Sequence, residues 1–454
     1  MVVDIAVVGS GYVGTVIAAC LAHVGHSVVG LEADPMKVAS LRRGRAPLFE
    51  QGLDVLLEAG IRAGSLRFTD DAAEAISGAR VVFLCVGTPA GDSGRPDLSA
   101  LEAAARAIAS SLRDGQVIVT KSTVPIGTGN WLATVLEDAV AAMRADRPEF
   151  SVVSNPEFLR EGSAVQDFLH PDRIVIGSDD EHALDLVEAV YEPILSQQFG
   201  GANGHAPHLL RTSLASAEMV KYAANAFLAT KISFVNEIAN LCERVGASVN
   251  EVAVGIGLDV RIGPHFLNAG AGWGGSCFGK DLMALMSTAV DLGCDTRLLR
   301  ATIEANAAQR KIVIEKLQRH LGTLRGRRVA LLGLAFKPGT DDVRDAPAIE
   351  VIDRLTELGA RVHAHDPVVT TLAGSTVRIA ATVEDATRDA DAIVVMTEWA
   401  EYRTLDLHTL RAHMRGDVLV DGRNVFDPHR ALEAGFRYES FGRPTSVRTA
   451  VSRV

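Results

Sequence analysis

The sequence predicts an α/β protein with two Rossmann-like parallel-sheet domains joined by a long central helix. A strand, glycine-rich turn, helix and strand open the chain, and a second series of short apolar strands begins near Arg325. A helix-forming stretch from about Thr212 to Val245 separates them. Strands that alternate with helices are typical of parallel sheets. We expect a first domain at 1–205, a central helical region at 206–315 and a second domain at 316–454.

Composition and charge exclude several classes of protein. The chain has 454 residues and a formal net charge of -11, with no long Lys/Arg run, so no nucleic-acid partner is expected. No signal peptide is recognisable, and no apolar run approaches the roughly 18 residues of a membrane span, so no membrane association is expected. The five cysteines are scattered without a CxxC motif, which indicates neither disulfides nor a metal site and fits a cytoplasmic location.

The first turn carries a dinucleotide fingerprint. The apolar strand Asp4 to Val8 runs into Gly9-Ser10-Gly11-Tyr12-Val13-Gly14, and a second strand ends at Glu32. In this motif the first glycine makes a tight turn, the second admits the pyrophosphate and the third lets helix and strand pack. An acidic residue roughly 20 residues on hydrogen-bonds ribose hydroxyls and repels a 2′-phosphate. The pattern therefore predicts NAD rather than NADP.

Polar residues follow the next strands of the predicted first sheet. Arg80 to Val86 ends in Gly87-Thr88-Pro89, and Gln116 to Lys121 ends in Ser122-Thr123-Val124-Pro125. Ligands of open α/β sheets lie beyond the carboxyl ends of the strands, so both ends should border the cofactor. After the strand Ser151 to Ser154, Glu157 and Glu161 stand at i and i+4. They either share one helical face in a site or begin a solvated helix.

The long helix from about Thr212 to Val245 would span about 50 Å at 1.5 Å per residue. This length exceeds that of a helix within one Rossmann unit, so we expect a connector between domains and a dimer surface. Lys221 and Asn225 project from one face of it. The lysine either reaches solvent or lines a site.

A glycine cluster at Gly272 to Asp281 holds Cys277 close to a lysine and an aspartate. A nearby ammonium favours the thiolate, which is the nucleophilic form. Ser276 and Asp281 are acceptable N-cap types, so a helix is expected to start here. A buried structural cysteine is the alternative interpretation.

The first strand of the second series is followed by a turn that differs from the glycine-rich turn of the first domain. Arg328 to Leu334 is followed by Ala335-Phe336-Lys337-Pro338-Gly339, which lacks the third glycine of a dinucleotide fingerprint. Later strands are expected at Arg361 to His365, Asp391 to Thr397 and Val418 to Asp421. We infer a second phosphate-bearing ligand held by the cation of Lys337; the alternative is a purely structural domain.

Taken together, these motifs resemble the UDP-glucose/GDP-mannose dehydrogenase family over nearly the whole chain. The resemblance rests on the following segments, in this order: Gly9 to Gly14, Val86 to Pro89, Lys121 to Pro125, Asn155 to Gly162, Lys221 to Phe227, Arg261 to Pro264, Gly274 to Asp281, Ala335 to Lys337 and Asp421 to Arg423.

The resemblance implies that a sugar nucleotide's primary alcohol is oxidised twice with NAD, as in the conversion of UDP-glucose to UDP-glucuronate. Cys277 would be the nucleophile that forms a thiohemiacetal and then a thioester. Lys221 and Asn225 would stabilise the oxyanion. Asp281 would work with Lys221 and a water in proton transfer, and Thr123 would help to hold that water. Glu157 would be the base for hydrolysis.

The resemblance also assigns binding residues. The cofactor side would comprise Gly9, Gly11, Tyr12, Val13, Gly14, Glu32, Lys37, Thr88, Thr123, Glu161, Lys280 and Arg344. The substrate side would comprise Glu157, Phe158, Leu159, Arg160, Lys221, Asn225, Arg261, Phe266, Asn268, Gly270, Gly274, Lys337 and Arg423. Arg261 would reach the substrate of a partner subunit in a homodimer or higher homo-oligomer. Gly279, Trp273 and Glu32 depart from the commoner family residues without removing a reacting group.

Other activities remain open at this point. The same chemistry would act on GDP-mannose or a UDP-N-acetylhexosamine. A two-electron NAD-dependent hydroxyacid dehydrogenase would use a catalytic lysine and no covalent intermediate. A non-catalytic nucleotide-binding module would bind the sugar nucleotide without turnover.

Overall fold

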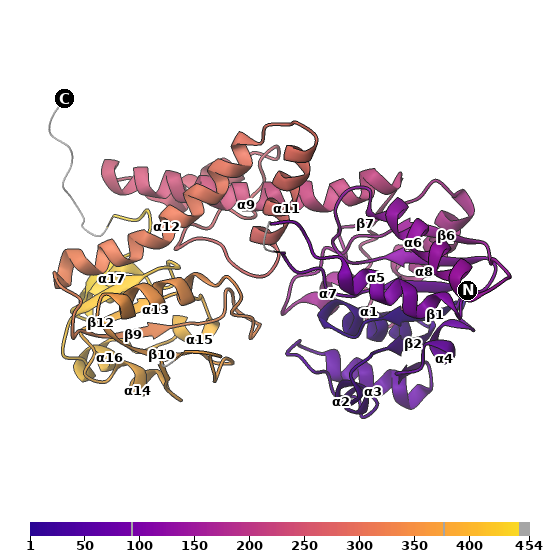
Figure 1. Cartoon of the computed structure of the whole chain (residues 1–454). Helices are drawn as coiled ribbons and strands as arrows, with labels where there is room; N and C mark the ends of the chain where they lie inside the picture. Colours follow the sequence, from indigo (N-terminus) through magenta and orange to yellow (C-terminus); the bar gives the residue numbers. More distant parts are fainter. Residues whose placement is uncertain (92–93, 376, 445–454) are drawn as a thin grey trace. The chain divides into compact units, whose positions relative to one another are not determined.

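Two sheets, one in each half of the chain, form the framework of the fold (Figure 1). The computed structural model describes residues 1–91, 94–375 and 377–444, so the end of the expected second domain, 445–454, lies outside the described residues. The chain divides into an N-terminal unit of residues 1–224 and 283–293 and a C-terminal unit of residues 225–282 and 294 onward.

The N-terminal unit has an eight-stranded sheet in the order β3-β2-β1-β4-β5-β6-β7-β8. Its first six strands have the order of a dinucleotide-binding sheet, which confirms the expected first Rossmann domain. All pairs are parallel except β6 and β7, which meet antiparallel at Ser154 and Gly177. The strands are β1 (Asp4–Val8), β2 (Ser27–Leu31), β3 (Leu66–Thr69), β4 (Val81–Leu84), β5 (Gln116–Thr120), β6 (Phe150–Ser154), β7 (Arg173–Gly177) and β8 (His208–Thr212).

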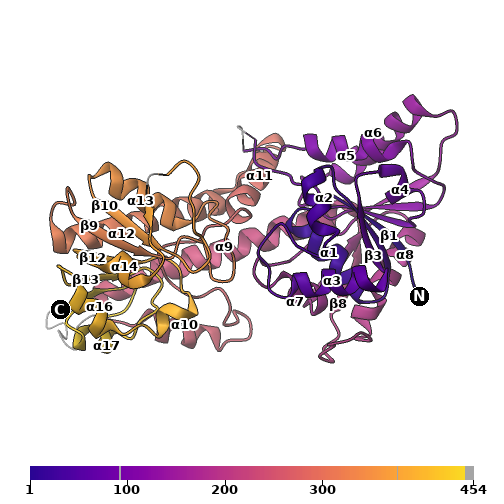
Figure 2. The ribbon, with the colours of Figure 1, turned by 90° about the horizontal axis from the view of Figure 1, so that it is seen from below.

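Helices cover both faces of this sheet because its strands are apolar on both sides (Figure 2). In β1, Ile5 and Val7 pack toward one core, and Ala6 and Val8 pack toward the other. The first core includes α1 (Tyr12–His23), α3 (Leu53–Ala63), α7 (Ala164–Leu169) and α8 (Glu181–Leu195). The second includes α4 (Ala72–Ile76), α5 (Ser99–Ala109) and α6 (Thr128–Met143), and α2 (Pro35–Leu41) follows β2.

The C-terminal unit holds a six-stranded parallel sheet in the order β11-β10-β9-β12-β13-β14. This repeats the strand order of the first six strands of the N-terminal sheet, which confirms the expected second Rossmann-like domain. The strands are β9 (Arg328–Leu332), β10 (Arg361–His365), β11 (Arg378–Ile379), β12 (Ala392–Val395), β13 (Val418–Asp421) and β14 (Arg437–Glu439). The helices are α10 (Val249–Gly257), α12 (Arg297–Leu321), α13 (Pro347–Glu357), α14 (Val383–Thr387), α15 (Ala400–Arg403), α16 (Leu407–His413) and α17 (Pro428–Glu433), and α11 (Phe278–Asp291) belongs to both units.

The expected long helix is α9 (Leu214–Val245), which has 32 residues and joins the two units. It ends at Gly246, whose φ of 76° is the left-handed conformation that glycine adopts at a helix end. In the part of the chain that the structure describes, no helix is both long and apolar enough to cross a membrane.

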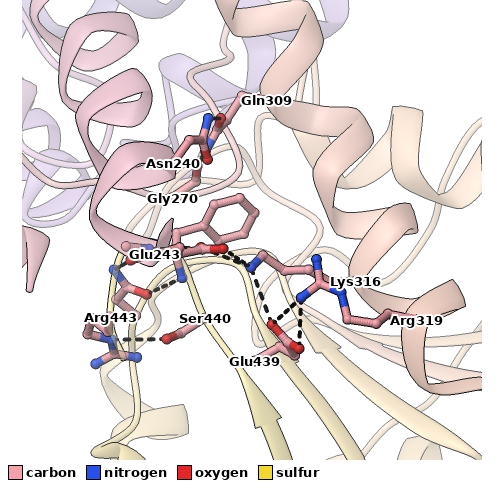
Figure 3. Close-up of polar contacts among 12 residues, drawn as sticks. Asn240, Glu243, Gly270, Gln309, Lys316, Arg319, Glu439, Ser440 and Arg443 are labelled. Atoms are coloured by element: carbon pink, nitrogen blue, oxygen red, sulfur yellow. Dashed lines mark hydrogen bonds and ion pairs between the residues drawn. The ribbon is translucent and has the colours of Figure 1, made fainter. Parts of the chain in front are cut away.

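A buried polar cluster joins the end of α9 to α12 and β14 within the C-terminal unit (Figure 3). The ammonium of Lys316 is fully buried and lies 2.8 Å from Glu243 and 3.3 Å from Glu439. Glu439 also accepts hydrogen bonds from Arg319 at 3.0 Å and pairs with His320 at 2.8 Å. We call these five residues the Lys316 cluster.

Candidate active site

The glycine-rich turn between β1 and α1 has the geometry of a dinucleotide site. Gly9 has a φ of 90°, and a Cβ on Gly14 would stand 1.8 Å from the carbonyl oxygen of Gly9, so neither position accepts a side chain without rearrangement. A Cβ on Gly11 would meet nothing within 4 Å, which leaves this face of the turn open. Helix α1 begins at Tyr12, next to Val13, with its positive end at the turn.

Glu32 lies beside this turn. Its Oε2 accepts a hydrogen bond from the Ser10 N–H at 3.0 Å, and its Oε1 accepts one from Asp34 N–H at 3.0 Å. Lys37 is exposed on α2. Thr88 and Thr123 meet at the carboxyl end of the sheet, where the Thr88 hydroxyl donates to the Thr123 carbonyl at 2.7 Å.

The segment after β6 is not helical, so the interpretation of Glu157 and Glu161 as neighbours on a helical face is wrong. Gly162 has a φ of 81°, which a helix does not accommodate, and the Leu159 N–H is bonded to the side chain of Glu157. Instead, Glu157 accepts from the Leu159 N–H at 2.6 Å and from the Lys221 ammonium at 3.0 Å. The side chains of Lys221 and Glu157 are only 5% and 10% exposed, so this ion pair is buried. Of the two alternatives for Lys221, the one in which it reaches solvent is wrong.

Hydrogen bonds to Glu50, which the sequence did not indicate, connect the segment after β6 to the glycine-rich turn. The Tyr12 hydroxyl donates to the carboxylate of Glu50, and the Gly162 N–H donates to the same carboxylate at 2.7 Å. Burial, followed by the hydrogen bond to Glu50, raises the pKa of Tyr12. Tyr12 therefore remains a neutral donor at physiological pH.

The other residues predicted from this segment have protein partners in the N-terminal unit. The Phe158 ring stacks with Arg173, whose guanidinium carbon lies 3.9 Å from the ring centroid. Arg160 makes a bidentate ion pair with Asp167, at 3.0 Å and 2.6 Å. Leu159 and Glu161 are partly buried.

Lys121, which the sequence showed only as part of a motif, is hydrogen-bonded to Asn155 at the start of the same segment. It is 5% exposed, and its ammonium donates to Asn155 Oδ1 at 3.1 Å. The Tyr191 hydroxyl donates to the same oxygen at 2.6 Å. Burial lowers the pKa of Lys121 to about 8. No sequence signal distinguishes this lysine from a solvent-exposed one, because its burial depends on α8 and β6.

Cys277 is exposed and stands directly before the first residue of α11. Its carbonyl accepts the Asp281 N–H at 2.8 Å, and the Ser276 hydroxyl lies 3.6 Å from its sulfur. The expected helix start is therefore present, and the positive end of a helix favours an anion such as a thiolate. The interpretation of Cys277 as a buried structural cysteine is wrong, whereas Cys20, Cys85 and Cys242 are buried.

The Lys221–Glu157 pair is one polar cluster of the candidate site. Asp281 is the centre of a second one, which lies in the C-terminal unit. It is 1% exposed, and its two oxygens accept from Asn225 Nδ2 and from the Lys280 ammonium, each at 2.6 Å. Asn225 follows Lys221 by one turn of α9, so a single helix supplies one member of each polar cluster.

The glycines before Cys277 lie close to backbone atoms of other segments. A Cβ on Gly274 would lie 2.3 Å from the Asp345 carbonyl oxygen, and one on Gly270 would lie 2.6 Å from the Gly422 carbonyl oxygen. The intervening Trp273 is buried, with its indole N–H donating to Ser233 at 3.0 Å. These close approaches fix the loop that carries the thiol.

The remaining predicted residues lie in the C-terminal unit. Arg423 donates to the Gly272 carbonyl at 2.8 Å, and burial lowers its pKa. Lys337 follows β9 and is partly buried, with its ammonium 5.7 Å from the Phe336 ring centroid. Arg344 pairs with Asp342 at 2.8 Å, and Arg261 pairs with Asp259 at 2.6 Å. Phe266 has a φ of 63°, and Asn268 is exposed.

The strand order, the glycine-rich turn and the thiol at a helix start place this chain in the class of dinucleotide-dependent oxidoreductases with two Rossmann-type sheets. Residues 3–195 match the NAD binding domain of the UDP-glucose/GDP-mannose dehydrogenase family, residues 215–308 its central domain and residues 330–428 its UDP binding domain. The chain belongs to the UDP-glucose/GDP-mannose dehydrogenase family.

Individual relatives match the chain over almost its whole length. It is 46% identical over 448 residues to UDP-glucose 6-dehydrogenase of Rhizobium meliloti, covering 97% of this chain and 99% of that protein. It is 44% identical over 444 residues to UDP-glucose 6-dehydrogenase TuaD of Bacillus subtilis, covering 97% and 93%. A UDP-glucose dehydrogenase structure from Pyrobaculum islandicum aligns with a TM-score of 0.87 and 40% identity, covering 97% of both chains.

Proposed function

We propose that this protein catalyses the NAD-dependent four-electron oxidation of UDP-glucose to UDP-glucuronate. The observation that carries this proposal is the 44–46% identity, over nearly the whole chain, to proteins named UDP-glucose 6-dehydrogenase. Structures named for N-acetylated sugars are more distant: the UDP-D-ManNAc dehydrogenase of Pyrococcus horikoshii is 29% identical, with a TM-score of 0.84, covering 97% of this chain and 100% of that one. The GDP-mannose dehydrogenase structure of Pseudomonas aeruginosa is also 29% identical, with a TM-score of 0.52, covering 96% of this chain and 99% of that one. The glucose nucleotide is therefore favoured over a UDP-N-acetylhexosamine or GDP-mannose.

The residues around the first turn fit a bound NAD⁺. Gly11 leaves space for the pyrophosphate, the start of α1 offers N–H groups to it, and Glu32 stands where a ribose would be held. When bound there, NAD⁺ supplies the hydride acceptor for both oxidations. We assign NAD binding to residues 1–205, dimerisation and the cysteine loop to 206–315, and UDP-sugar binding to 316–454, a division that the matched ranges of the family's domains support.

Cys277 is proposed as the covalent nucleophile. Its thiolate bonds to C6 of the sugar at the aldehyde stage, which gives a thiohemiacetal, and loss of a second hydride from C6 leaves a thioester. The exposure of the sulfur at the start of α11 supports this role, because a nucleophile must be reachable and anion-stabilised.

The Lys221–Glu157 pair and the cluster around Asp281 stabilise charge and transfer protons during the oxidation. Lys221 and Asn225 stabilise the oxyanion that forms at C6, an electrostatic role that suits their burial. Asp281 takes part in the proton transfer, through a water that Thr123 helps to hold.

Glu157 is proposed as the base for hydrolysis of the thioester. It removes a proton from water, the water oxygen bonds to the thioester carbon, and the carbon–sulfur bond then breaks to release the carboxylate and the Cys277 thiolate. The ion pair with Lys221 holds the Glu157 carboxylate in place at 3.0 Å.

A homodimer is also proposed. Three apolar side chains on α9, which we call the α9 stripe, stand seven residues apart: Phe227, Phe234 and Leu241, with exposed fractions of 65%, 48% and 58%. Residues at this spacing share one helix face, and exposed large apolar side chains on one face fit a contact with a second copy of the chain. Arg261 is exposed beyond α10, as a residue contributed to a partner's site would be.

Counting NADH tests the proposed activity. Incubation with excess NAD⁺ and a limiting amount of UDP-glucose should yield two NADH per sugar, with UDP-glucuronate as the product. GDP-mannose and UDP-N-acetylmannosamine serve as the comparison substrates. One NADH per sugar would contradict the four-electron reaction, and faster turnover of either comparison substrate would reassign the sugar. Because the exposed thiol requires reducing surroundings, we also propose a cytoplasmic location.

A further inference from the structure

One face of α12 carries three buried polar side chains that contact the loop before Cys277, within the C-terminal unit. Asn306, Gln309 and Arg310 stand at i, i+3 and i+4 of this helix, and each is at most 8% exposed. Their side chains donate hydrogen bonds to backbone carbonyls of the loop 270–273. The proposed mechanism uses none of the three.

Both backbone groups of Trp273 are bonded to these side chains rather than to a helix or strand. The Trp273 N–H donates to Asn306 Oδ1 at 2.8 Å, and its carbonyl accepts from Asn306 Nδ2 at 3.0 Å and from Arg310 Nη2 at 2.7 Å. Gly272 leaves room for this contact, because a Cβ there would stand 2.6 Å from Asn306 Oδ1. Without such partners the buried peptide of Trp273 would be unsatisfied.

Arg310 extends these contacts to α13 and the residues before it. Its Nη1 donates to Asp345 Oδ1 and to Glu350 Oε2, each at 2.9 Å, and its Nη2 donates to the Asp345 carbonyl at 3.2 Å. The Gly275 N–H donates to the carbonyl of Arg344, in the same segment, at 3.0 Å. The loop is thereby held at two points before the sulfur.

The position of this loop matters because Cys277 follows it directly and is exposed. A group that forms a covalent bond must stand close to the atom that it attacks, and a displacement of about 1 Å can slow a reaction about a hundredfold. Loops hold reactive groups less precisely than helices and strands do. The side chains of α12 supply the rigidity that the loop itself lacks.

We propose that Asn306 and Arg310 are positioning residues, which hold the Trp273 peptide and thereby place the Cys277 sulfur for bond formation with C6 of the sugar. This inference rests on the proposed function. It predicts that a loosened loop slows formation of the carbon–sulfur bond, while the binding of each ligand by its own sheet is little affected.

The rate of adduct formation tests the inference. Glu157→Gln lacks the proposed base for hydrolysis, so the Cys277 adduct should accumulate on this chain in the presence of NAD⁺ and UDP-glucose. Adding Asn306→Leu keeps the branching of the side chain but removes its hydrogen bonds. Rapid quenching with intact-mass detection should then show adduct formation at least fivefold slower, with the Kd values for NAD⁺ and for UDP within threefold.

Two controls separate this role from a general loss of stability. Gln318→Leu makes the same amide-to-leucine change at an exposed position of α12 and should leave the rate unaltered. Lys316→Met removes a buried cation from the same helix, outside the loop contacts, so it should lower the Tm without slowing the adduct. In unliganded Asn306→Leu, amide hydrogen exchange should accelerate in peptides covering 268–277 and stay unchanged in the strands β9 to β13.

An adduct rate less than fivefold slower in Asn306→Leu would overturn the inference, as would equal slowing in Lys316→Met. Arg310→Lys decides the matter if Asn306→Leu does not fold. Lysine lacks the planar fork that reaches Asp345 and the Trp273 carbonyl together, so adduct formation should slow at least threefold, and a smaller effect would contradict the proposal. Failure of the proposed function would appear differently, as no adduct on Glu157→Gln itself while the hydrogen-exchange comparison still holds.

Discussion

At the scale of single residues, the thiol of Cys277 determines whether the aldehyde intermediate can be oxidised further. Cys277→Ser keeps the shape of the loop but replaces a thiolate by a hydroxyl, which is a far weaker nucleophile at neutral pH. We expect kcat to fall by at least a thousandfold, while the Kd for NAD⁺, measured by fluorescence titration, changes less than threefold. Turnover within tenfold of wild type would rule out a covalent role for this sulfur.

The predicted base and nucleophile can be tested together. Glu157→Gln keeps a hydrogen-bonding side chain beside Lys221 but cannot accept a proton from water. Intact-mass spectrometry after incubation with NAD⁺ and UDP-glucose should therefore detect a covalent adduct on the Glu157→Gln chain. The double variant Glu157→Gln/Cys277→Ser should show no adduct. An adduct that persists in the double variant would place the bond on another residue.

A substitution of Lys337 tests which ligand the C-terminal sheet binds. It lies after β9 in the C-terminal unit, at the turn that lacks the third glycine. Lys337→Ala should raise the Kd for UDP-glucose by more than tenfold and leave the Kd for NAD⁺ within twofold, as isothermal titration would show. Equal losses for both ligands would contradict the assignment of the C-terminal sheet to the sugar nucleotide.

Sequence reasoning reached some of these residues and missed others for a physical reason. Cys277 and Lys221 stand out because glycines or apolar residues surround a reactive group, a contrast that is visible along the chain. Lys121 and Glu50 give no such contrast. Their burial is produced by residues more than 30 positions away, such as Asn155 and Gly162, so only the tertiary structure shows that they belong near the site.

At the scale of elements, the Lys316 cluster links α9, α12 and β14 in the C-terminal unit. Lys316→Met removes the buried cation and leaves Glu243 and Glu439 facing each other without it, at a cost of about 3 kcal/mol in the free energy of unfolding. Arg319 contacts the same Glu439 but is 56% exposed, so Arg319→Ala should cost about 1 kcal/mol or less. Urea unfolding of both variants checks this, and equal costs would contradict the importance of burial.

The same cluster predicts how stability depends on pH. Burial alone would raise the pKa of Glu439, but the hydrogen bond from His320 and the charges of Lys316 and Arg319 outweigh it and lower the pKa. The cluster therefore contributes stability above the ordinary glutamate pKa of about 4.5, and this contribution is lost as the pH falls through the lowered value. Glu439→Gln should flatten this acid limb in a plot of Tm against pH.

Element by element, the sequence predicted best where the local pattern is unambiguous. The apolar strands beside the glycine-rich turn and the 32-residue α9 have clear patterns and clear glycine ends. β8 was not expected, because it lies at the edge of the sheet and its residues are exposed or half-buried, without apolar alternation. The helix expected from the spacing of Glu157 and Glu161 is absent, because the Glu157 side chain accepts the Leu159 N–H and Gly162 has a left-handed φ of 81°.

At the scale of the whole molecule, the α9 stripe predicts self-association. Phe234→Glu places a charge in the middle of the stripe, where a second copy would have to bury it. The variant should elute as a monomer in size-exclusion chromatography with light scattering, whereas wild type should have at least the mass of a dimer. Lys311→Gln makes the charge of exposed α12 more negative by the same one unit and should leave the mass unaltered. An unchanged mass for Phe234→Glu would exclude the stripe as the contact.

The unequal exposure of the cysteines has a practical consequence for handling the protein. Cys277 is open to solvent at a helix start, while Cys20, Cys85 and Cys242 are enclosed by the core. Peroxide or iodoacetamide should therefore modify Cys277, and the likewise exposed Cys294, long before the other three. Preparations stored without reductant will lose activity as this sulfur passes from the reversible sulfenic to the irreversible sulfinic state, while the fold stays intact.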